Sequence, residues 1–257
     1  MVTVRRLSIT PVKGTRLQEV EVIRLDSWGV RENRRFYLIN EQDEMVNSLR
    51  LGELHTAVFS YSDEHRSLRA ELPGGRVLEE DVVAGPEVST QFYGEAKTAR
   101  VVEGPWSDVL SDLVGQPLRL VEADGQGAVD RGPRAAVSLI SQASLGRLAE
   151  EGDLDGIDAR RFRMLVEVDG LDPHAEDAWV GSPVRLGEAL VAFEGHAGRC
   201  NITTRNPVTG TVDAPTLKIL GRYRQDVEST EPLPFGVYGR VVEPGAVRLG
   251  DSAAVEG

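Results

Sequence analysis

The chain has 257 residues, of which 40% are hydrophobic and 27% are charged, as in an ordinary soluble globular protein. This length is enough for one large or two modest domains with cores of their own. The formal net charge of -12 argues against broad nucleic-acid binding, which requires a basic surface. One cysteine excludes an internal disulfide. Together with four histidines in no paired ligand spacing, it also excludes the usual four-ligand structural zinc site.

Alternating or short apolar runs predict strands along most of the chain. We expect them at residues 2–11, 18–25, 35–40, 56–61, 67–72, 98–103, 118–122, 162–169, 184–193 and 237–249. The segment LPGGRV at 72–77 is a hairpin signal. Many short strands separated by glycine and proline are typical of barrels or sandwiches rather than of a doubly wound sheet.

Helical spacing of apolar residues predicts helices at 105–114, 142–151 and 215–224. The first would stop at Gly115, and Ser141 would be the N-cap of the second. The acidic, glycine-bearing segment at about 115–132 is expected to cross between two β-rich halves. The predicted fold class is therefore mainly β (α+β), with two β-barrel-like domains, at 1–116 and 117–257, and a few short helices.

The sequence also predicts the compartment of the protein. The apolar runs are only a few residues long, which is too short to span a membrane. The alternating start has no apolar segment after its two arginines, so it does not read as a signal peptide. With its single cysteine, the chain is expected in a reducing cytoplasm, with no membrane and no nucleic-acid partner.

The one cysteine, Cys200, lies in an unusual setting for a packing residue. Residues 195–210 read GHAGRCNITTRNPVTG, whereas a cysteine used only for packing usually has apolar neighbours. Arg199 and Arg205 would favour the thiolate, which is both a nucleophile and a soft metal ligand. Either role explains the setting. The plain alternative is an incidental thiol in a β-rich ligand-binding protein.

Several short motifs follow one another in a recognisable order. They are ITPVKG at 9–14, RFYL at 35–38, SQASL at 141–145, FR at 162–163, EDAW at 176–179, RCNITTRNPVTG at 199–210 and FGVY at 235–238. In this order they resemble the MOSC superfamily, in the branch with an additional N-terminal β-barrel domain. That branch includes the mitochondrial amidoxime-reducing component and bacterial relatives. The likeness runs over nearly the whole chain.

The resemblance implies a molybdenum cofactor, a pyranopterin whose molybdenum is bound by a cysteine thiolate. Carried onto the matching position, Cys200 would be the metal ligand, as suits a soft metal. The other implied cofactor-binding residues are basic or polar: Lys13, Arg35, Ser138, Ser141, Arg163, Arg199, Thr203, Thr204 and Tyr238. Free N–H groups at the start of the 142–151 helix would add donors for the cofactor phosphate.

Some of these residues have plainer interpretations. His196, four residues before Cys200, is a candidate proton donor near the metal, or else it only hydrogen-bonds its own loop. Thr203 and Thr204 also fit residues that satisfy loop backbone groups. Without the resemblance, Lys13 and Arg35 would be a solvated turn residue and a strand-edge residue, and Arg163 could pair with nearby aspartates at the surface.

The resemblance implies an oxidoreductase that reduces N-hydroxylated substrates, namely hydroxylamines, amidoximes or N-oxides. A fused plant-type ferredoxin domain would need four cysteines, and no cysteine follows Cys200. The electrons would therefore come from a separate ferredoxin-like or flavin reductase partner. The alternative is a carrier that holds the cofactor, or carries sulfur as a Cys200 persulfide, without turning over a substrate.

Overall fold

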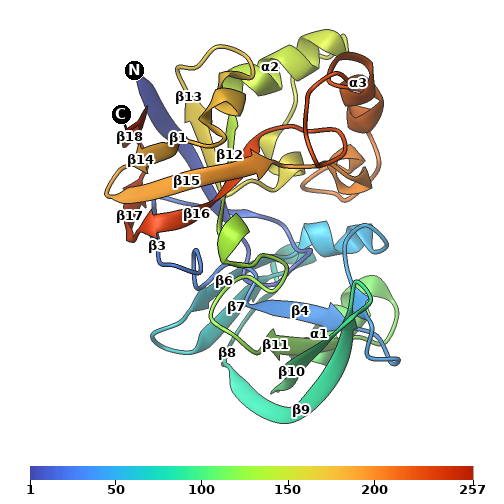
Figure 1. Cartoon of the computed structure of the whole chain (residues 1–257). Coiled ribbons are helices and arrows are strands. Elements are labelled where there is room, and N and C mark those ends of the chain that lie inside the picture. Colours follow the sequence, from blue (N-terminus) through green and yellow to red (C-terminus); the bar gives the residue numbers. More distant parts are fainter. Residues whose placement is uncertain (257) are drawn as a thin grey trace.

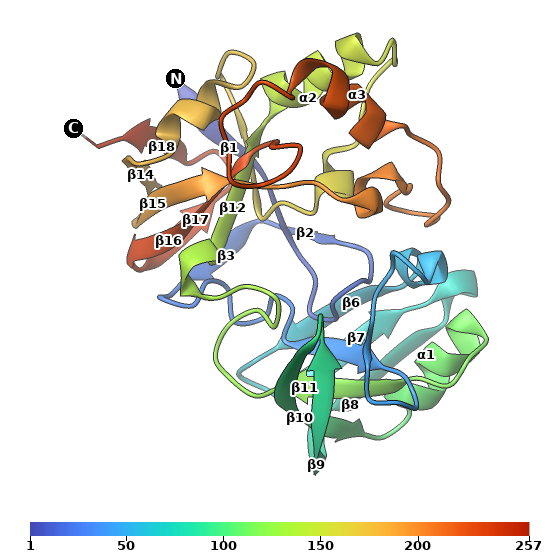
Figure 2. The same cartoon turned by 45° about the vertical axis from the view of Figure 1, so that its right-hand side comes forward.

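A computed structural model describes residues 1–256 and shows a chain of two lobes (Figures 1 and 2). In the first, the barrel lobe, seven strands close into a ring. Around the ring they are β1 (Val2–Ile9), β18 (Ser252–Val255), β14 (Pro183–Leu186), β15 (Ala189–His196), β16 (Val237–Glu243), β12 (Val137–Ser141) and β13 (Val166–Asp169). The ring closes because β13 pairs back onto β1, from Thr3 opposite Asp169 to Leu7 opposite Val166.

Closure of the barrel follows from the pattern of β1. Its residues Val4, Leu7 and Ile9 are buried, and they join the apolar inner faces of the other ring strands in one core. A closed ring also leaves no unpaired edge in these strands. Two short strand pairs extend the lobe: β2 (Gln18–Val20) pairs with β1, and β3 (Val22–Leu25) pairs with β17 (Gly245–Arg248).

The second lobe, the sheet lobe, is built from two antiparallel sheets and a helix. The larger sheet has the order β5 (Met45–Val46), β4 (Phe36–Ile39), β11 (Arg119–Ala123), β10 (Glu95–Glu103) and β9 (Val83–Phe92). The smaller holds β6 (Val58–Ser62), β7 (Ser67–Glu71) and β8 (Val77–Asp81). Between them the aromatic rings of Phe59 and Trp106 lie 6.1 Å apart in a core that is separate from that of the barrel.

Within residues 1–256 the α-helices are α1 (Trp106–Val114), α2 (Gln142–Glu151) and α3 (Thr216–Tyr223). They agree with the predicted ranges to within a residue. The Ser141 side chain accepts a hydrogen bond from the Ser144 N–H and so caps α2, and α1 ends at Gly115, which has a left-handed φ of 72°. Short 3-10 turns complete the elements: η1 (Gly52–Thr56), η2 (Pro73–Gly75), η3 (Pro133–Ala135), η4 (Ala159–Phe162), η5 (Ala175–Trp179) and η6 (Asn201–Thr204).

The mainly β fold is confirmed, with some differences in the strands. The run predicted at 184–193 is a hairpin, because the chain turns at Gly187 between β14 and β15. The run predicted at 162–169 becomes a strand only at Val166, after η4. None of the helices in the described part of the chain is long and apolar enough to cross a membrane.

Strand pairing does not follow the boundary expected at residues 116 and 117. β1 belongs to the barrel lobe, and β11 pairs with β4 in the sheet lobe, from Arg119 opposite Ile39 to Glu122 opposite Phe36. The chain therefore crosses to the sheet lobe over residues 26–35, between β3 and β4, and returns to the barrel lobe over residues 124–132, which we call the connecting loop. Lys13, Arg34 and this loop meet where the lobes adjoin.

Candidate functional site

A cavity of about 420 Å³ lies where the two lobes meet, and we call it the Cys200 cavity. This volume is in the range of small-molecule sites. The barrel lobe, the sheet lobe and the connecting loop all contribute to its lining. Its charged residues are Lys13, Arg34, Asp130, Arg131, Arg163 and Arg199. Among the described lining residues, five cations thus face one carboxylate, which is a setting for an anion.

Cys200 is exposed and lines this cavity. Its backbone is extended and forms the N-cap of η6. The N–H and the hydroxyl of Thr203 both donate to the Cys200 carbonyl oxygen, each at 3.1 Å. The Thr203 hydroxyl also lies 2.7 Å from that of Thr216 on α3. The hydrogen bonds from Thr203 therefore fix the loop backbone, and the thiol remains at the cavity surface.

Arg199 anchors the same loop to the barrel lobe. Its guanidinium donates to the carbonyl oxygens of Phe162 at 3.0 Å and Phe235 at 2.8 Å, and it lies 3.0 Å from the Met164 sulfur. Burial, and next the charge of Arg131, lower the pKa of Arg199 to about 9, while Cys200 opposes this. The side chain holds the loop of Cys200 in place and adds a positive charge that forms no ion pair with a carboxylate of residues 1–256.

Arg163 follows η4 in a left-handed conformation with φ of 53°. One of its nitrogens donates to the Thr15 carbonyl oxygen at 2.8 Å, which joins the barrel lobe to the segment after β1. Burial, and next the charge of Arg34, lower the pKa of Arg163 to about 9, against the influence of Asp130. Both causes disfavour the charged guanidinium, and a bound anion would stabilise it.

Asp130 pairs with two of the cations. Its carboxylate lies 2.5 Å from the Lys13 Nζ and 3.1 Å from the Arg34 Nη1. Burial alone would raise the pKa of Asp130, but Arg34 and Lys13 outweigh it and hold that pKa well below its usual range. The pKa of Lys13 is lowered, mainly by burial. Asp130 therefore stays ionised and fixes Lys13 and Arg34, which leaves the other cations available.

The guanidinium of Arg131 forms fewer hydrogen bonds than the charged groups of the other cations in the cavity. Its guanidinium has no hydrogen-bond acceptor among residues 1–256, although its backbone N–H donates to the Ala128 carbonyl. Burial and the charge of Arg34 lower the pKa of Arg131. Sequence reasoning missed Arg34, Tyr93, Asp130 and Arg131. Asp130 and Arg131 could have been found from the prediction that residues 115–132 cross between the lobes, because a segment that crosses there can line a cavity between them.

Comparison with known proteins identifies the family of this chain. The model of the MOSC N-terminal beta barrel domain matches residues 1–117, and the model of the MOSC domain matches residues 126–254. The chain belongs to the MOSC family. It is 26% identical over 285 residues to mitochondrial amidoxime-reducing component 1 of Homo sapiens, covering 97% of this chain and 81% of the relative. The Xenopus laevis protein of the same name is 26% identical over 286 residues, covering 96% and 80%.

Solved structures also resemble this MOSC protein. The YUAD protein from Bacillus subtilis matches with a TM-score of 0.45 and 14% identity, covering 98% of this chain and 94% of its own. YiiM from Geobacillus stearothermophilus matches with a TM-score of 0.37 and 17% identity, covering 49% and 56%.

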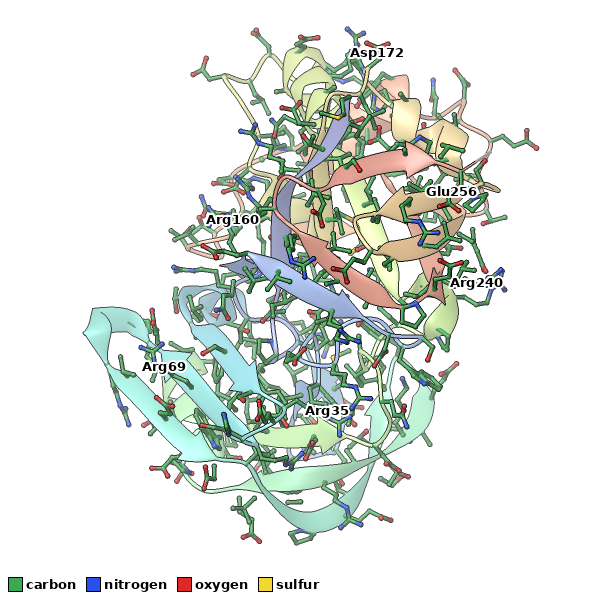
Figure 3. The ribbon with its side chains drawn as sticks, turned by 90° about the vertical axis from the view of Figure 1, so that its left-hand side faces the viewer. Arg35, Arg69, Arg160, Asp172, Arg240 and Glu256 are labelled. Atoms are coloured by element: carbon green, nitrogen blue, oxygen red, sulfur yellow. The ribbon has the colours of Figure 1, made fainter. Side chains whose placement is uncertain are left out.

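Of the residues proposed from the sequence, several line the Cys200 cavity of this MOSC protein: Lys13, Arg163, Arg199, Cys200 and Thr203. Arg35 does not. Its guanidinium lies 3.1 Å from the Glu122 carboxylate within the sheet lobe, where Figure 3 shows it. The reason is the left-handed φ of 54° at Arg34, which directs Arg34 to the cavity and turns Arg35 to the other side.

The two serines before α2 are engaged inside the barrel lobe. The Ser138 hydroxyl accepts a hydrogen bond from the Leu165 N–H at 3.1 Å. The Ser141 N–H and hydroxyl donate to the two oxygens of Glu176, at 3.1 and 2.9 Å, and the Ser144 hydroxyl adds a bond of 2.7 Å. The buried Glu176 carboxylate thus occupies the helix N-terminus where a cofactor phosphate was expected.

The remaining candidates also lie outside the lining of the Cys200 cavity. The His196 Nε2 is 3.7 Å from Asp177, whose carboxylate pairs with Arg224 at 2.8 Å. The Thr204 hydroxyl donates to the carbonyl oxygen of residue 201 at 2.7 Å, a local loop bond. The ring of Tyr238 packs closely against Gly195 of the neighbouring strand β15. His196, Thr204 and Tyr238 could therefore affect a ligand in the Cys200 cavity only through other residues.

Proposed function

We propose that this MOSC protein binds a molybdenum cofactor in the Cys200 cavity and uses it to reduce N-hydroxylated compounds. One observation carries the proposal: an exposed thiol lines a cavity in which five cations face one carboxylate. Relatives named amidoxime-reducing component, similar over nearly the whole chain, point to the same class of substrate.

The residues of the cavity fit such a cofactor chemically. Molybdenum coordinated by dithiolene sulfurs is a soft metal centre, for which a thiolate is a suitable protein ligand. The cofactor phosphate is an anion that needs cationic and N–H donors. Burial is the main cause of the lowered pKa values of Arg163 and Arg199, both about 9, and repulsion from neighbouring cations adds to it. An anionic cofactor would remove that repulsion.

Each group in the cavity then has a role. Cys200 would hold the metal, and Arg131 and Arg163 would hold the anionic part of the cofactor. Arg199 and Thr203 fix the loop that carries the thiol. When bound, the cofactor supplies the two-electron reduction that removes oxygen from nitrogen, and two protons complete the loss as water. Since His196 lies outside the lining, we assign proton supply to the Nζ of Lys13, which is held by Asp130.

The electrons come from a separate partner in this proposal. These 257 residues contain one cysteine, so they cannot bind an iron–sulfur cluster through cysteine thiolates. A ferredoxin-like or flavin-containing reductase would supply two electrons for each substrate molecule. A cytoplasmic location, with its reducing conditions, is part of the same proposal.

The exposure of Cys200 favours a second candidate. A thiol that solvent reaches is also accessible to a persulfide donor. Cys200 would accept the donor's outer sulfur, the donor would leave as a thiol, and the Cys200 persulfide would pass that sulfur on. In that function the cavity would hold the cofactor, or an anionic acceptor, without turnover of an N-hydroxylated compound.

The test is purification of the full chain from a host that makes the cofactor. Molybdenum is counted by mass spectrometry, and reduction of a hydroxylamine is followed with a chemical electron donor. We expect about one molybdenum per chain together with turnover. Molybdenum without turnover, or sulfane sulfur on Cys200 without molybdenum, would favour the carrier. Protein with neither would contradict both functions, and a host unable to make the cofactor provides the control.

A further inference from the structure

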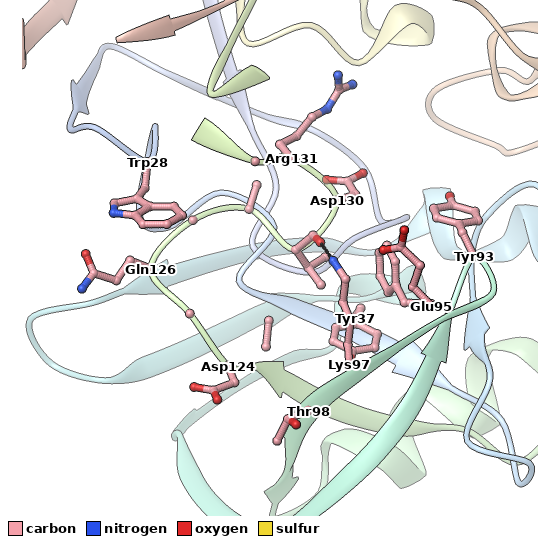
Figure 4. Close-up of a pocket in the computed structure, with 17 residues that line it drawn as sticks. Trp28, Tyr37, Tyr93, Glu95, Lys97, Thr98, Asp124, Gln126, Asp130 and Arg131 are labelled. Carbon is pink, nitrogen blue, oxygen red and sulfur yellow. Dashed lines mark hydrogen bonds between the residues drawn. The ribbon is translucent and has the colours of Figure 1, made fainter. Parts of the chain in front are cut away.

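The larger sheet of the sheet lobe ends at β9, and this edge is protected against pairing with another chain. Pro86 within β9 has no N–H to offer, and the register with β10 shifts once, as at a β-bulge. Near the end of the strand the Gln91 N–H donates to the Asp43 carbonyl oxygen at 2.9 Å. The β9–β10 hairpin is also tied to the connecting loop, because the Nζ of Lys97 donates to the Val129 carbonyl oxygen at 2.6 Å beside a cavity of about 650 Å³ (Figure 4).

The smaller sheet ends at β8, and this edge has none of these features. Residues 77–81 read VLEED, with no proline and no lysine. They pair with β7 in a regular register, from Ser67 opposite Asp81 to Glu71 opposite Val77. All residues of β8 except Leu78 are exposed. Prolines, lysines and bulges are what usually protect an edge strand, so the edge of β8 is straight and open.

The hydrogen bonds at the two ends of this ladder show which backbone groups of β8 are free. The Val82 N–H donates to the Arg66 carbonyl oxygen at 2.6 Å, and the Leu72 N–H donates to the Arg76 carbonyl oxygen at 2.8 Å. Hydrogen-bonded pairs alternate along an antiparallel ladder, so the even-numbered residues of β8 bond to β7. The N–H and C=O groups of residues 77, 79 and 81 point away from β7, and no hydrogen bond within residues 1–256 uses them.

The side chains along the open edge are acidic. Glu79, Glu80 and Asp81 follow one another in β8. In the part of the chain that the structure describes, only Glu79 among them has a cation within ion-pair distance, Arg69 at 3.8 Å. The Arg69 guanidinium is also 2.5 Å from the Glu71 carboxylate. An exposed and shared cation of this kind adds little, so the edge keeps its negative charge.

This charge decides what can pair with β8. Antiparallel pairing of two copies of β8 about a two-fold axis would place Glu79 opposite Glu79 and bring the acidic residues of both copies together. Like charges directly opposite each other destabilise a sheet, whereas opposite charges stabilise it. The acidic side chains therefore exclude a second copy of this edge and favour a strand that carries positive charge.

We propose that β8 is a docking edge for an extended, basic segment of another protein, which adds to the smaller sheet as a further strand. Main-chain hydrogen bonds to residues 77, 79 and 81 hold the segment, and the side chains of β8 select its sequence. Basic residues lie opposite positions 79–81, and apolar residues lie opposite Val77 and Leu78. In the antiparallel orientation the segment therefore reads three basic residues followed by two apolar ones. None of these β8 residues lines the Cys200 cavity, and the inference does not depend on the proposed function.

The test is titration of the full chain, labelled with ¹⁵N, with the blocked peptide TKRKVVT. Two control peptides separate charge from main-chain pairing. TEDEVVT reverses the charges, and TKRKVVT that is N-methylated at both lysines and at the second valine keeps the charges but loses the N–H groups that would face β8. We expect TKRKVVT to bind at least about tenfold more tightly than either control, because both kinds of contact contribute.

Hydrogen exchange of the amides, followed by NMR, locates the bound peptide. The amides of Val77, Glu79 and Asp81 should exchange rapidly in the free protein and slowly in the complex. The amides of Leu78 and Glu80 should exchange slowly in both, because they are already bonded to β7.

A pair of variants at one position tests the free backbone group. Glu79→Pro removes the N–H that points away from β7, and the φ of proline suits an edge strand, so the protein should fold. We expect TKRKVVT to bind at least about tenfold more weakly. Glu79→Gln is the matched control, because it loses the same charge but keeps the N–H, and binding should weaken only about twofold to threefold. Glu228→Gln, at an exposed position in the barrel lobe, should change nothing.

Several results would overturn the inference. They are equal binding of the three peptides, slowed exchange only at amides outside β8, or a Glu79→Pro protein that binds as tightly as Glu79→Gln. A free protein that sediments as a dimer, with slow exchange at residues 77, 79 and 81, would make a second copy the occupant instead. None of these results bears on molybdenum content or turnover, so the docking edge and the proposed function can fail separately.

Discussion

The Cys200 cavity and the N-terminus of α2 both lie in or beside the barrel lobe, and both are places of positive potential. In the cavity, the positive charge comes from side chains that outnumber the one carboxylate among them. At α2 it comes from free N–H groups, and the buried Glu176 already occupies that position, accepting hydrogen bonds from Ser141 and Ser144. One place is open to an external anion, whereas the other has been filled from within the chain.

The difference shows how an anion site can be recognised. A helix N-terminus binds a phosphate only where its donors are free. We propose that Arg131 and Arg163 take the phosphate-binding role expected at α2, because within residues 1–256 no carboxylate forms an ion pair with either of them. Each prediction below changes one side of this comparison, in order of decreasing effect.

The largest effect is expected from Cys200→Ser. The change removes the soft ligand, so the molybdenum content of the purified protein should fall to background. Because Cys200 is exposed, the midpoint of thermal unfolding should stay within about 2 °C of the unchanged protein. Metal analysis and calorimetry measure the two quantities. A variant that retains molybdenum would mean that the cations alone hold the cofactor.

Acid should destabilise the protein through His55, which is buried beside the cavity. Burial, and next the charge of Arg163, lower the pKa of His55 to about 4, against an ordinary 6.5. The folded state thus disfavours the proton. Its contribution is fully present above pH 6.5 and is lost as the pH falls toward 4, about 3 kcal/mol in all. His174, near α2, also has a pKa lowered to about 4, chiefly by burial. Acid therefore destabilises the surroundings of both histidines.

Denaturant unfolding at pH 7 and pH 4 measures this loss. In His55→Gln the loss between the two pH values should be smaller than in the unchanged protein. His65→Gln, at an exposed position, is the control and should show the same loss of unfolding free energy between the two pH values as the unchanged protein. An identical pH dependence in all three proteins would show that His55 is protonated as readily when folded as when unfolded.

Arg163→Asn and Arg35→Asn form a matched pair for cofactor retention. Asparagine tolerates the left-handed conformation of residue 163. Loss of the Arg163 charge should weaken retention about a hundredfold, as expected for charge-assisted hydrogen bonds to a phosphate. Arg35→Asn should leave retention unchanged, although it removes a partner of Glu122. Molybdenum lost during gel filtration and dialysis measures both. Equal losses would mean that the effect is one of folding.

The smallest effect is expected from Glu176→Gln. The amide has one acceptor oxygen where the carboxylate has two, so the bonds from Ser141 and Ser144 cannot all be kept. We expect the free energy of unfolding to fall by about 2 kcal/mol, with no change in cofactor retention. Glu150→Gln, at an exposed position on α2, is the control. Weaker cofactor retention in Glu176→Gln, but not in Glu150→Gln, would mean that the N-terminus of α2 contributes to cofactor binding.

The sequence predicted the mainly β fold and the helices because those depend on local patterns. The bounds of α2, for example, follow from the Ser141 cap and the apolar spacing after it. Cys200, Lys13 and Arg163 could be proposed for one site because they belong to motifs, and they do line one cavity. Whether they bind a cofactor stays a prediction.

Other parts of the site could not be predicted, for physical reasons. A single left-handed residue, Arg34, decides which of two adjacent arginines faces the cavity, and a φ angle is not visible in the sequence. Tyr93, in the turn between β9 and β10, lines the Cys200 cavity because the two lobes meet there, which is a long-range property. The engagement of Ser141 depends on Glu176, 35 residues further along the chain.

The position of β1 has a consequence for the order of assembly. This strand is made before its partners in the ring, β13 and β18, with Thr3 opposite both Asp169 and Ser252. A nascent chain on the ribosome therefore cannot complete the ring until β18 has emerged. Lys13, which follows β1 directly, and Cys200 can come to rest around a shared ligand only then. A ligand that needs both residues can therefore bind only after β18 has been made.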